Sequence, residues 1–125
     1  AHLQVMRGLL AAVEAAAWGG HFVGFTAALR AFNRTAGRPF AAAQGGVYAG
    51  PEVAAVVDRA DRLGGAGSGQ SSWGPTVYSF APDPEAAARL AAGLAAAFPA
   101  LTVEVTEPDV TGAVADGGPV YLPEW

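Results

Sequence analysis

The segment at residues 67–80, GSGQSSWGPTVYSF, gathers more residues able to bind a ligand than any other part of the chain. Glycine reaches backbone angles that are closed to other residues, and it lets a ligand approach the main chain closely. Successive backbone N–H groups in such a turn can bind an anion, and Ser and Gln side chains add donors. The candidates are Gly67, Gly69, Gln70, Ser71, Ser72, Trp73 and Gly74. On this pattern alone, the segment is either a loop that binds a ligand or a tight structural turn.

A second glycine-containing segment lies upstream, at residues 44–48, with the sequence QGGVY. It interrupts the helical pattern, which suits either a plain linker or part of a binding cleft. Gln44, together with Gln70, could hydrogen-bond a substrate or hold the two segments together. Tyr48 combines an apolar ring with a polar hydroxyl and is a further cleft candidate, beside Gly45 and Gly46.

Residues typical of acid–base or metal chemistry are few. The two histidines, His2 and His21, fall in predicted N-terminal helices, and two isolated histidines without cysteine rarely form a metal site. Two carboxylate pairs are explained by a polar helix face and by a helix start, namely Asp58 with Asp61 and Asp83 with Glu85. The sequence therefore indicates no catalytic base, and we expect no metal to be bound by this domain alone.

The composition excludes several classes of protein. The 125 residues, 52% of them apolar, suffice for one domain with a hydrophobic core. The net charge is −4 and the arginines are scattered, so nucleic-acid binding is not expected. The chain has no lysine, which excludes a Walker-type phosphate lysine within it. Cysteine is absent, no apolar run suits a membrane span and no signal peptide is visible, so we expect a cytoplasmic protein without membrane contact.

Hydrophobic periodicity predicts the elements that must position these residues. Helices are expected up to residues 18–20, over 20–35, over 51–63 and over 84–98, with Gly and Pro at their ends. Alternating apolar and polar residues predict strands at 76–80 and 101–106, and residues 112–115 favour a further short strand. The aromatic residues of the tail, DGGPVYLPEW, are expected to dock on the body or on another chain, which would allow a homodimer.

The predicted order is three helices, a strand, a loop, a strand, a helix and a strand. Residues 76–106 fit a right-handed strand–helix–strand crossover. This order predicts an α+β fold, with a small, mainly antiparallel sheet and helices packed on one face.

Two stretches resemble a known family. The string GQSSWGPTVY, at residues 69–78, resembles a motif of the beta-ribofuranosylaminobenzene 5'-phosphate synthase family. With its flanking residues, the same stretch resembles the third conserved motif of the GHMP superfamily of small-molecule kinases. The segment QGGVYAGPEVAAVV, at residues 44–57, is similar to the part of that synthase family that precedes the same helix. The resemblance covers residues 22–115.

The resemblance implies a ferredoxin-like fold of the GHMP kinase C-terminal type. It also implies a reaction in which 5-phosphoribosyl 1-pyrophosphate is joined to 4-aminobenzoate or 4-hydroxybenzoate, with release of carbon dioxide and pyrophosphate, in methanopterin biosynthesis. Mg²⁺ is expected in the complete enzyme. The residue 67–74 loop would face phosphate or carboxylate oxygens, and Trp73 would either stack on the benzoate ring or anchor the core.

This chain departs from the family pattern in one respect. Members also have an N-terminal domain with a phosphate loop of the Pro-x-x-x-Gly-Leu-Gly-Ser-Ser kind, and no such motif stands in this sequence. We therefore expect the chain to work with that N-terminal domain and to be inactive alone. Two other functions stay open: the C-terminal domain of a GHMP-type kinase that uses ATP, and a non-enzymatic domain that binds a small molecule.

Overall fold

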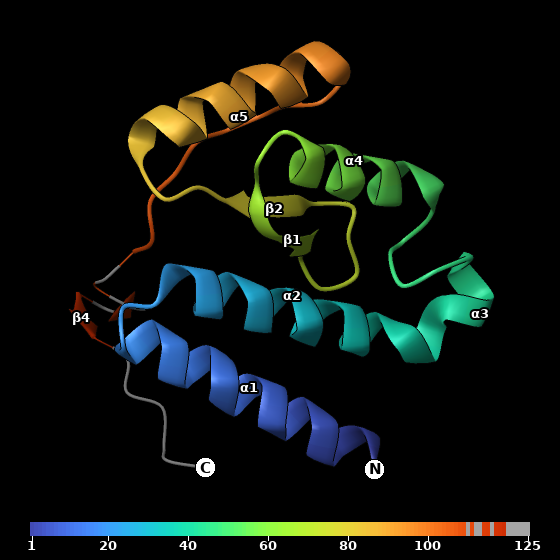
Figure 1. Ribbon diagram of the computed structural model, residues 1–125, viewed down its shortest axis with the longest axis vertical. Helices are drawn as coiled ribbons and strands as arrows, with labels where there is room; N and C mark the ends of the chain where they lie inside the picture. Colours follow the sequence, from blue (N-terminus) through green and yellow to red (C-terminus); the bar gives the residue numbers. More distant parts are fainter. Residues whose placement is uncertain (110, 112–113, 116, 120–125) are drawn as a thin grey trace.

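The first two helices form an antiparallel pair. A computed structural model describes residues 1–109, 111, 114–115 and 117–119. Helix α1 covers His2–Trp18 and α2 covers Phe22–Gly37, and they lie side by side (Figure 1). The chain reverses at Gly20, whose φ of +68° suits glycine. The two predicted helices are confirmed, although α2 begins and ends two residues later than the pattern indicated.

The central sheet is a hairpin of two antiparallel strands. Strand β1 covers Ala66–Gln70 and β2 covers Val77–Phe80, and Gly69 pairs with Tyr78. A strand before the loop and the strand at residues 76–80 were both predicted, but residues 67–70 were expected in the loop and instead belong to β1. Small residues are needed there because β1 packs against α2. A Cβ on Gly69 would lie 2.6 Å from Oδ1 of Asn33, so any side chain would separate strand and helix.

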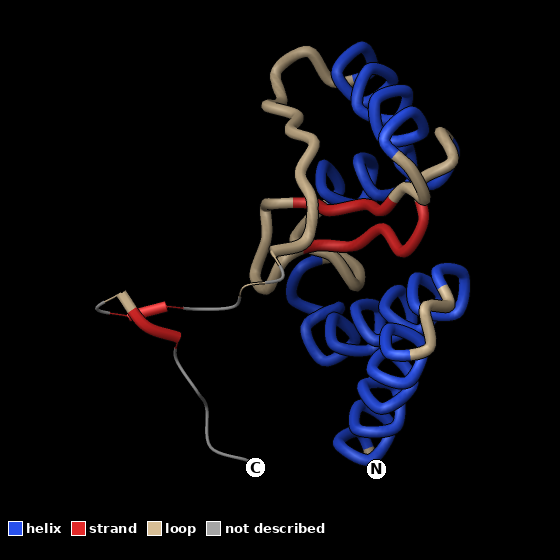
Figure 2. Tube along the Cα trace, turned by 90° about the vertical axis from the view of Figure 1, so that its left-hand side faces the viewer, coloured by secondary structure: helices blue, strands red, loops and turns tan. Residues whose placement is uncertain are grey.

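Two further helices complete the described core. Helix α4 covers Pro51–Arg62 and α5 covers Pro84–Ala97. The side chain of Asp83 caps α5 by accepting a hydrogen bond of 2.8 Å from the backbone N–H of Ala86. The hairpin lies between α2 on one side and α4 with α5 on the other (Figures 1 and 2). The buried core is formed by Tyr48, Val53 and Val57, with Val77 of β2 packed against it.

The prediction of a strand at residues 101–106 is wrong, because this segment has no regular secondary structure. Its apolar residues remain accessible, with Val105 exposed by 58%. An alternating sequence forms a strand only where a neighbouring strand supplies partners for its N–H and C=O groups. In the part of the chain that the structure describes, the central sheet contains β1 and β2 and no third strand. The predicted crossover therefore does not form.

The short strand predicted at residues 112–115 is confirmed in part. Strand β3, Val114–Ala115, pairs antiparallel with β4, Gly118–Pro119, whereas residues 112 and 113 lie outside the described residues. The α+β class and the antiparallel pairing are confirmed. None of the helices in the described ranges combines the length and hydropathy that crossing a bilayer requires.

Candidate functional site

The tip of the hairpin is a tight turn at residues 71–76. The backbone N–H of Ser71 donates to the carbonyl of Thr76 at 2.8 Å, and that of Gly74 donates to the carbonyl of Ser71 at 2.9 Å. Ser72 has a φ of +51°, which is uncommon for a residue other than glycine. Within the described ranges, the backbone N–H groups of Ser72 and Trp73 have no protein acceptor. These two donors, with the exposed Ser71 and Ser72 hydroxyls, are available to a ligand.

Gln70 joins the two glycine-containing segments. Its side-chain Oε1 accepts a hydrogen bond of 2.7 Å from the backbone N–H of Ala49. Its Nε2 donates to the carbonyl of Ser72 at 3.0 Å. The side chain is buried. The sequence left two roles open for Gln70, and these contacts fit the role in which it holds the two segments together.

Asn33 of α2 is a site residue that sequence reasoning missed. Its Nδ2 donates to the carbonyl of Gln70 at 2.7 Å, and its Oδ1 accepts from the N–H of Gln70 at 3.2 Å. The amide thus pairs with the end of β1 as a neighbouring strand would. The signal was a lone asparagine in the otherwise largely apolar sequence FVGFTAALRAFNRTAG.

A concavity of about 200 Å³ lies between the end of α2, the short helix α3 (Ala41–Gln44) and the turn. It brings together the predicted residues Gln44, Gln70, Ser72 and Trp73, with Asn33, Ala36, Gly37 and Phe40 as further lining. Trp73 is 77% exposed, so it is not a core anchor. Its ring meets that of Phe40 edge to face, with the centroids 5.4 Å apart. Two aromatic rings therefore stand together at the rim.

The other predicted residues lie elsewhere. Gly67 and Gly69 are buried in β1, and Gly45 and Gly46 form the turn after α3, both with positive φ. Tyr48 is a core residue whose buried hydroxyl has no partner among the described residues. Neighbouring Tyr78 is also affected: burial, and to a lesser extent the proximity of Tyr48, raise the pKa of its phenol.

The concavity has an uncharged lining. Its polar side-chain groups are the amides of Asn33, Gln44 and Gln70, the hydroxyl of Ser72 and the indole N–H of Trp73. Across the described parts of the chain, no group of three or more His, Asp or Glu side chains could hold a metal ion. The lining contains no carboxylate, the side chain through which proteins usually bind Mg²⁺, so we assign no step to a metal held by the described residues.

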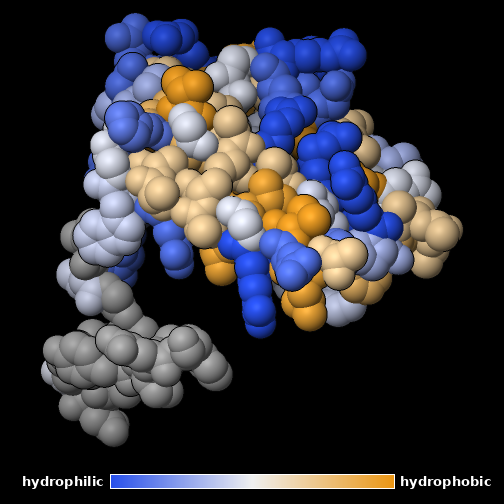
Figure 3. Space-filling view, turned by 60° about the horizontal axis from the view of Figure 1, so that its bottom comes forward, coloured by the Kyte–Doolittle hydropathy of each residue, from blue (hydrophilic) through white to orange (hydrophobic). Residues whose placement is uncertain are grey.

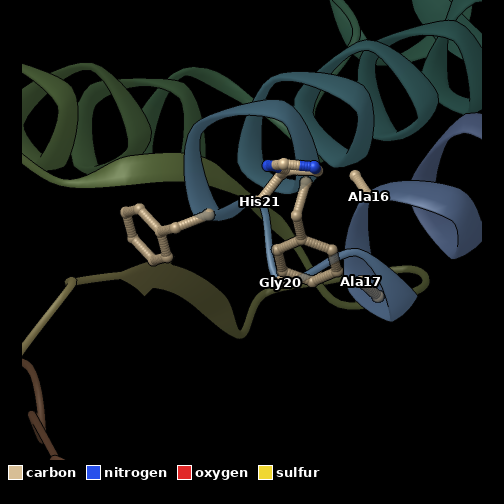
Figure 4. A pocket seen from close by; sticks show the side chains of 6 residues that line it. Ala16, Ala17, Gly20 and His21 are labelled. Atoms are coloured by element: carbon tan, nitrogen blue, oxygen red, sulfur yellow. The ribbon is translucent and has the colours of Figure 1, made fainter.

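A second, more open concavity of about 300 Å³ lies at the corner between α1 and α2 (Figure 4). Alanine and phenylalanine dominate its lining, and His21 is the one titratable side chain among the six residues, which are Ala16, Ala17, Gly20, His21, Phe22 and Phe25. A histidine acting as a general base is usually oriented by a carboxylate or carbonyl partner, and this lining contains no carboxylate. We therefore place the candidate site at the concavity beside Trp73.

The comparisons with known proteins identify the family. Residues 11–100, well over half of the chain, match the family described as GHMP kinases C terminal. No match was found among curated proteins or among solved structures. The α+β fold with its antiparallel hairpin agrees with the family match. The chain belongs to the family of GHMP kinase C-terminal domains.

Proposed function

We propose that this chain forms one wall of the substrate cleft of a GHMP-superfamily enzyme that carries out the beta-ribofuranosylaminobenzene 5'-phosphate synthase reaction. The observation that carries the proposal is the convergence of Gln44, Gln70, Ser72 and Trp73 on one concavity, from two segments that both resemble the synthase family. Small-molecule pockets usually measure about 300–1,000 Å³. A concavity of about 200 Å³ therefore suits part of a cleft that an N-terminal domain completes.

The lining favours the benzoate over the pyrophosphate. It offers no cation to a pyrophosphate group, whereas Trp73 and Phe40 offer aromatic surface to a benzoate ring. The backbone N–H groups of Ser72 and Trp73 and the Ser72 hydroxyl would donate hydrogen bonds to the carboxylate of the benzoate. The phosphate loop expected in the N-terminal domain would hold the phosphoribosyl pyrophosphate. A divalent metal would neutralise pyrophosphate charge in the complete enzyme, with ligands outside the described residues.

The lack of a base in this wall is compatible with the chemistry. If the new bond forms between the ribose carbon and the ring carbon that carries the carboxylate, pyrophosphate leaves the ribose carbon with the electron pair of the broken carbon–oxygen bond. The electron pair of the breaking carbon–carboxylate bond then returns to the ring as carbon dioxide leaves. No ring proton then has to be removed, so no general base is required at this step. The wall's task is to orient the ring and hold the carboxylate until it leaves.

The test is an assay of the full-length protein that contains this chain. We expect 4-aminobenzoate labelled at its carboxylate to release labelled carbon dioxide only when phosphoribosyl pyrophosphate is present. Replacement of Ser72 by Ala should lower kcat/KM roughly 10- to 100-fold, the usual effect of losing a hydrogen bond to a charged group. Thr102→Ala, an exposed hydroxyl deletion outside the lining, is the matched control. An unchanged rate in Ser72→Ala would refute its role.

A second candidate is a small-molecule kinase, which the description of the matched family favours. ATP turnover with an alcohol acceptor, and no carbon dioxide release, would support this candidate against the synthase. Binding of 4-aminobenzoate without turnover in either assay would instead support the non-enzymatic alternative.

A further inference from the structure

Helix α1 has a second surface besides the one that packs on α2. Its half-buried residues are Met6, Leu9, Val13 and Ala16. The adjoining face carries Leu3, Arg7, Leu10, Glu14 and Trp18, at successive spacings of four, three, four and four residues, which place them in one stripe. Leu3, Leu10 and Trp18 are exposed by 70%, 46% and 88%. Figure 3 brings the bottom of the Figure 1 view forward and shows apolar surface interrupted by hydrophilic residues.

Two charged side chains interrupt this apolar stripe. Arg7 and Glu14 are its only charged members, and neither takes part in an ion pair within the described ranges. Seven residues of helix separate them by about 10 Å, which is too far for them to pair with each other. An opposite charge for either side chain could therefore come only from outside this stripe.

The stripe complements itself in an antiparallel arrangement. If a second copy of α1 is related by a twofold axis between Leu10 and Ala11, Arg7 of each copy faces Glu14 of the other. The same axis sets Leu3 opposite Trp18, and Leu10 opposite the small side chain of Ala11. A parallel arrangement would instead place Arg7 against Arg7 and Glu14 against Glu14, which is repulsive. An interface with twofold symmetry requires such a self-complementary patch.

We propose that α1 is a homodimer interface, in which two copies of the chain pair antiparallel through Leu3, Arg7, Leu10, Glu14 and Trp18. The family match begins at residue 11, so the first half of this stripe lies outside it. No lining residue of the candidate site takes part. The proposal therefore stands whether or not the synthase assignment is correct.

The expected dimer is weak and sensitive to salt. Helix α1 has 17 residues and is thus about 25 Å long, and one helix face covers less than the roughly 800 Å² per partner of a standard interface. We expect dissociation in the micromolar range. Because two exposed ion pairs contribute, the dissociation constant should rise with ionic strength.

The experiment compares the dimer dissociation constants of charge-reversal variants. They are measured by sedimentation equilibrium on the full-length protein that contains this chain. Arg7→Glu leaves two facing Glu pairs and Glu14→Arg leaves two facing Arg pairs, so each should raise the dissociation constant at least 10-fold. The double variant Arg7→Glu/Glu14→Arg restores opposite charges and should dimerise within about 3-fold of the wild type. An equimolar mixture of the two single variants should form a heterodimer.

The control substitution is Arg34→Glu, on α2. It reverses another exposed arginine that has no ion pair among the described residues, and it should leave the dissociation constant unchanged. Circular dichroism of each variant identifies loss of folding. A monomeric wild type at 100 µM, reversals without effect, or a double variant as weak as the single ones would each overturn the proposal. A monomer whose stability the reversals lower would point to an intramolecular partner for α1 and would also overturn it.

Discussion

At the residue scale, Gln70 shows how a side chain that suits ligand binding can instead serve the protein. Both of its amide atoms are engaged by the main chain, at Ala49 and at Ser72. Its own backbone is held by Asn33. Ser72 and Trp73 follow two and three positions later, so their placement at the concavity depends on these hydrogen bonds. Gln70 is therefore a positioning residue, and Ser72 and Trp73 are the candidates for ligand contact.

Replacement of Gln70 by Leu should lower the free energy of unfolding by about 1–3 kcal/mol, because two hydrogen bonds in a partly buried setting are lost. Gln44→Leu is the matched control, since Gln44 lines the same concavity without a hydrogen bond to the described residues. We expect it to change stability by less than about 0.5 kcal/mol. Urea unfolding measures both. Equal effects of the two substitutions would show that the side-chain hydrogen bonds of Gln70 do not stabilise the fold.

At the scale of elements, the concavity exists because α2 approaches its neighbours closely. Gly37, at the end of α2, lies against the carbonyl of Val47, so close that a Cβ would overlap it. Gly67 is also close to α2, because a Cβ there would lie 3.0 Å from both the Cβ and the carbonyl oxygen of Thr26. These contacts fix the distance from α2 to the loop and to β1, and with it the shape of the concavity. The glycines serve packing as much as backbone freedom.

Gly37→Ala should therefore destabilise the protein by at least about 1–3 kcal/mol, the usual cost of overpacking. The backbone angles of Gly37 are ordinary for a helix, so the cost is purely steric. Gly8→Ala is the opposite control: nothing lies within 4 Å of a Cβ there, and alanine should stabilise the helix interior by about 0.5–1 kcal/mol. Thermal unfolding followed by circular dichroism distinguishes the two. A neutral Gly37→Ala would contradict the close contact.

At the scale of the whole molecule, the composition leaves few side chains that can change the stability of the protein at alkaline pH. The chain has neither lysine nor cysteine, and arginine does not titrate below about pH 12. Above pH 9, the side chains that ionise are therefore tyrosines. Burial, and then the nearby Tyr48, raise the pKa of Tyr78 above its ordinary value of 10.0. The folded state thus favours the neutral phenol.

The raised pKa of Tyr78 makes the stability of the protein depend on pH. Because this pKa is higher in the folded than in the unfolded protein, the contribution of Tyr78 to stability is complete below about pH 10 and is lost as the pH rises above that value. Tyr78→Phe removes the titrating group, so its unfolding free energy should fall less steeply above pH 10 than that of the wild type. Between pH 7 and 9 the two curves should run parallel. Identical slopes above pH 10 would contradict the raised pKa.

The local sequence was sufficient to predict the ends of several helices and the superfamily of this protein. Gly and Pro mark the ends of the helices at Gly19–Gly20, at Pro51 and at Pro84, and each end is set by residues a few positions away. The motif at residues 69–78 was sufficient to indicate the GHMP superfamily, which the family match confirms. The same motif suggested the synthase reaction, which stays a prediction.

Only the tertiary structure decided the details of the site. Asn33 and Gln70 are separated by 37 positions, and nothing local to either residue indicates their pairing. Trp73 is exposed and meets the ring of Phe40, from another segment, at the surface. Residues 101–106 have the pattern of a strand, but no strand among the described residues pairs with them. In each case the outcome depends on contacts between distant segments, and a periodic pattern records which face of an element is apolar but not what will lie against it.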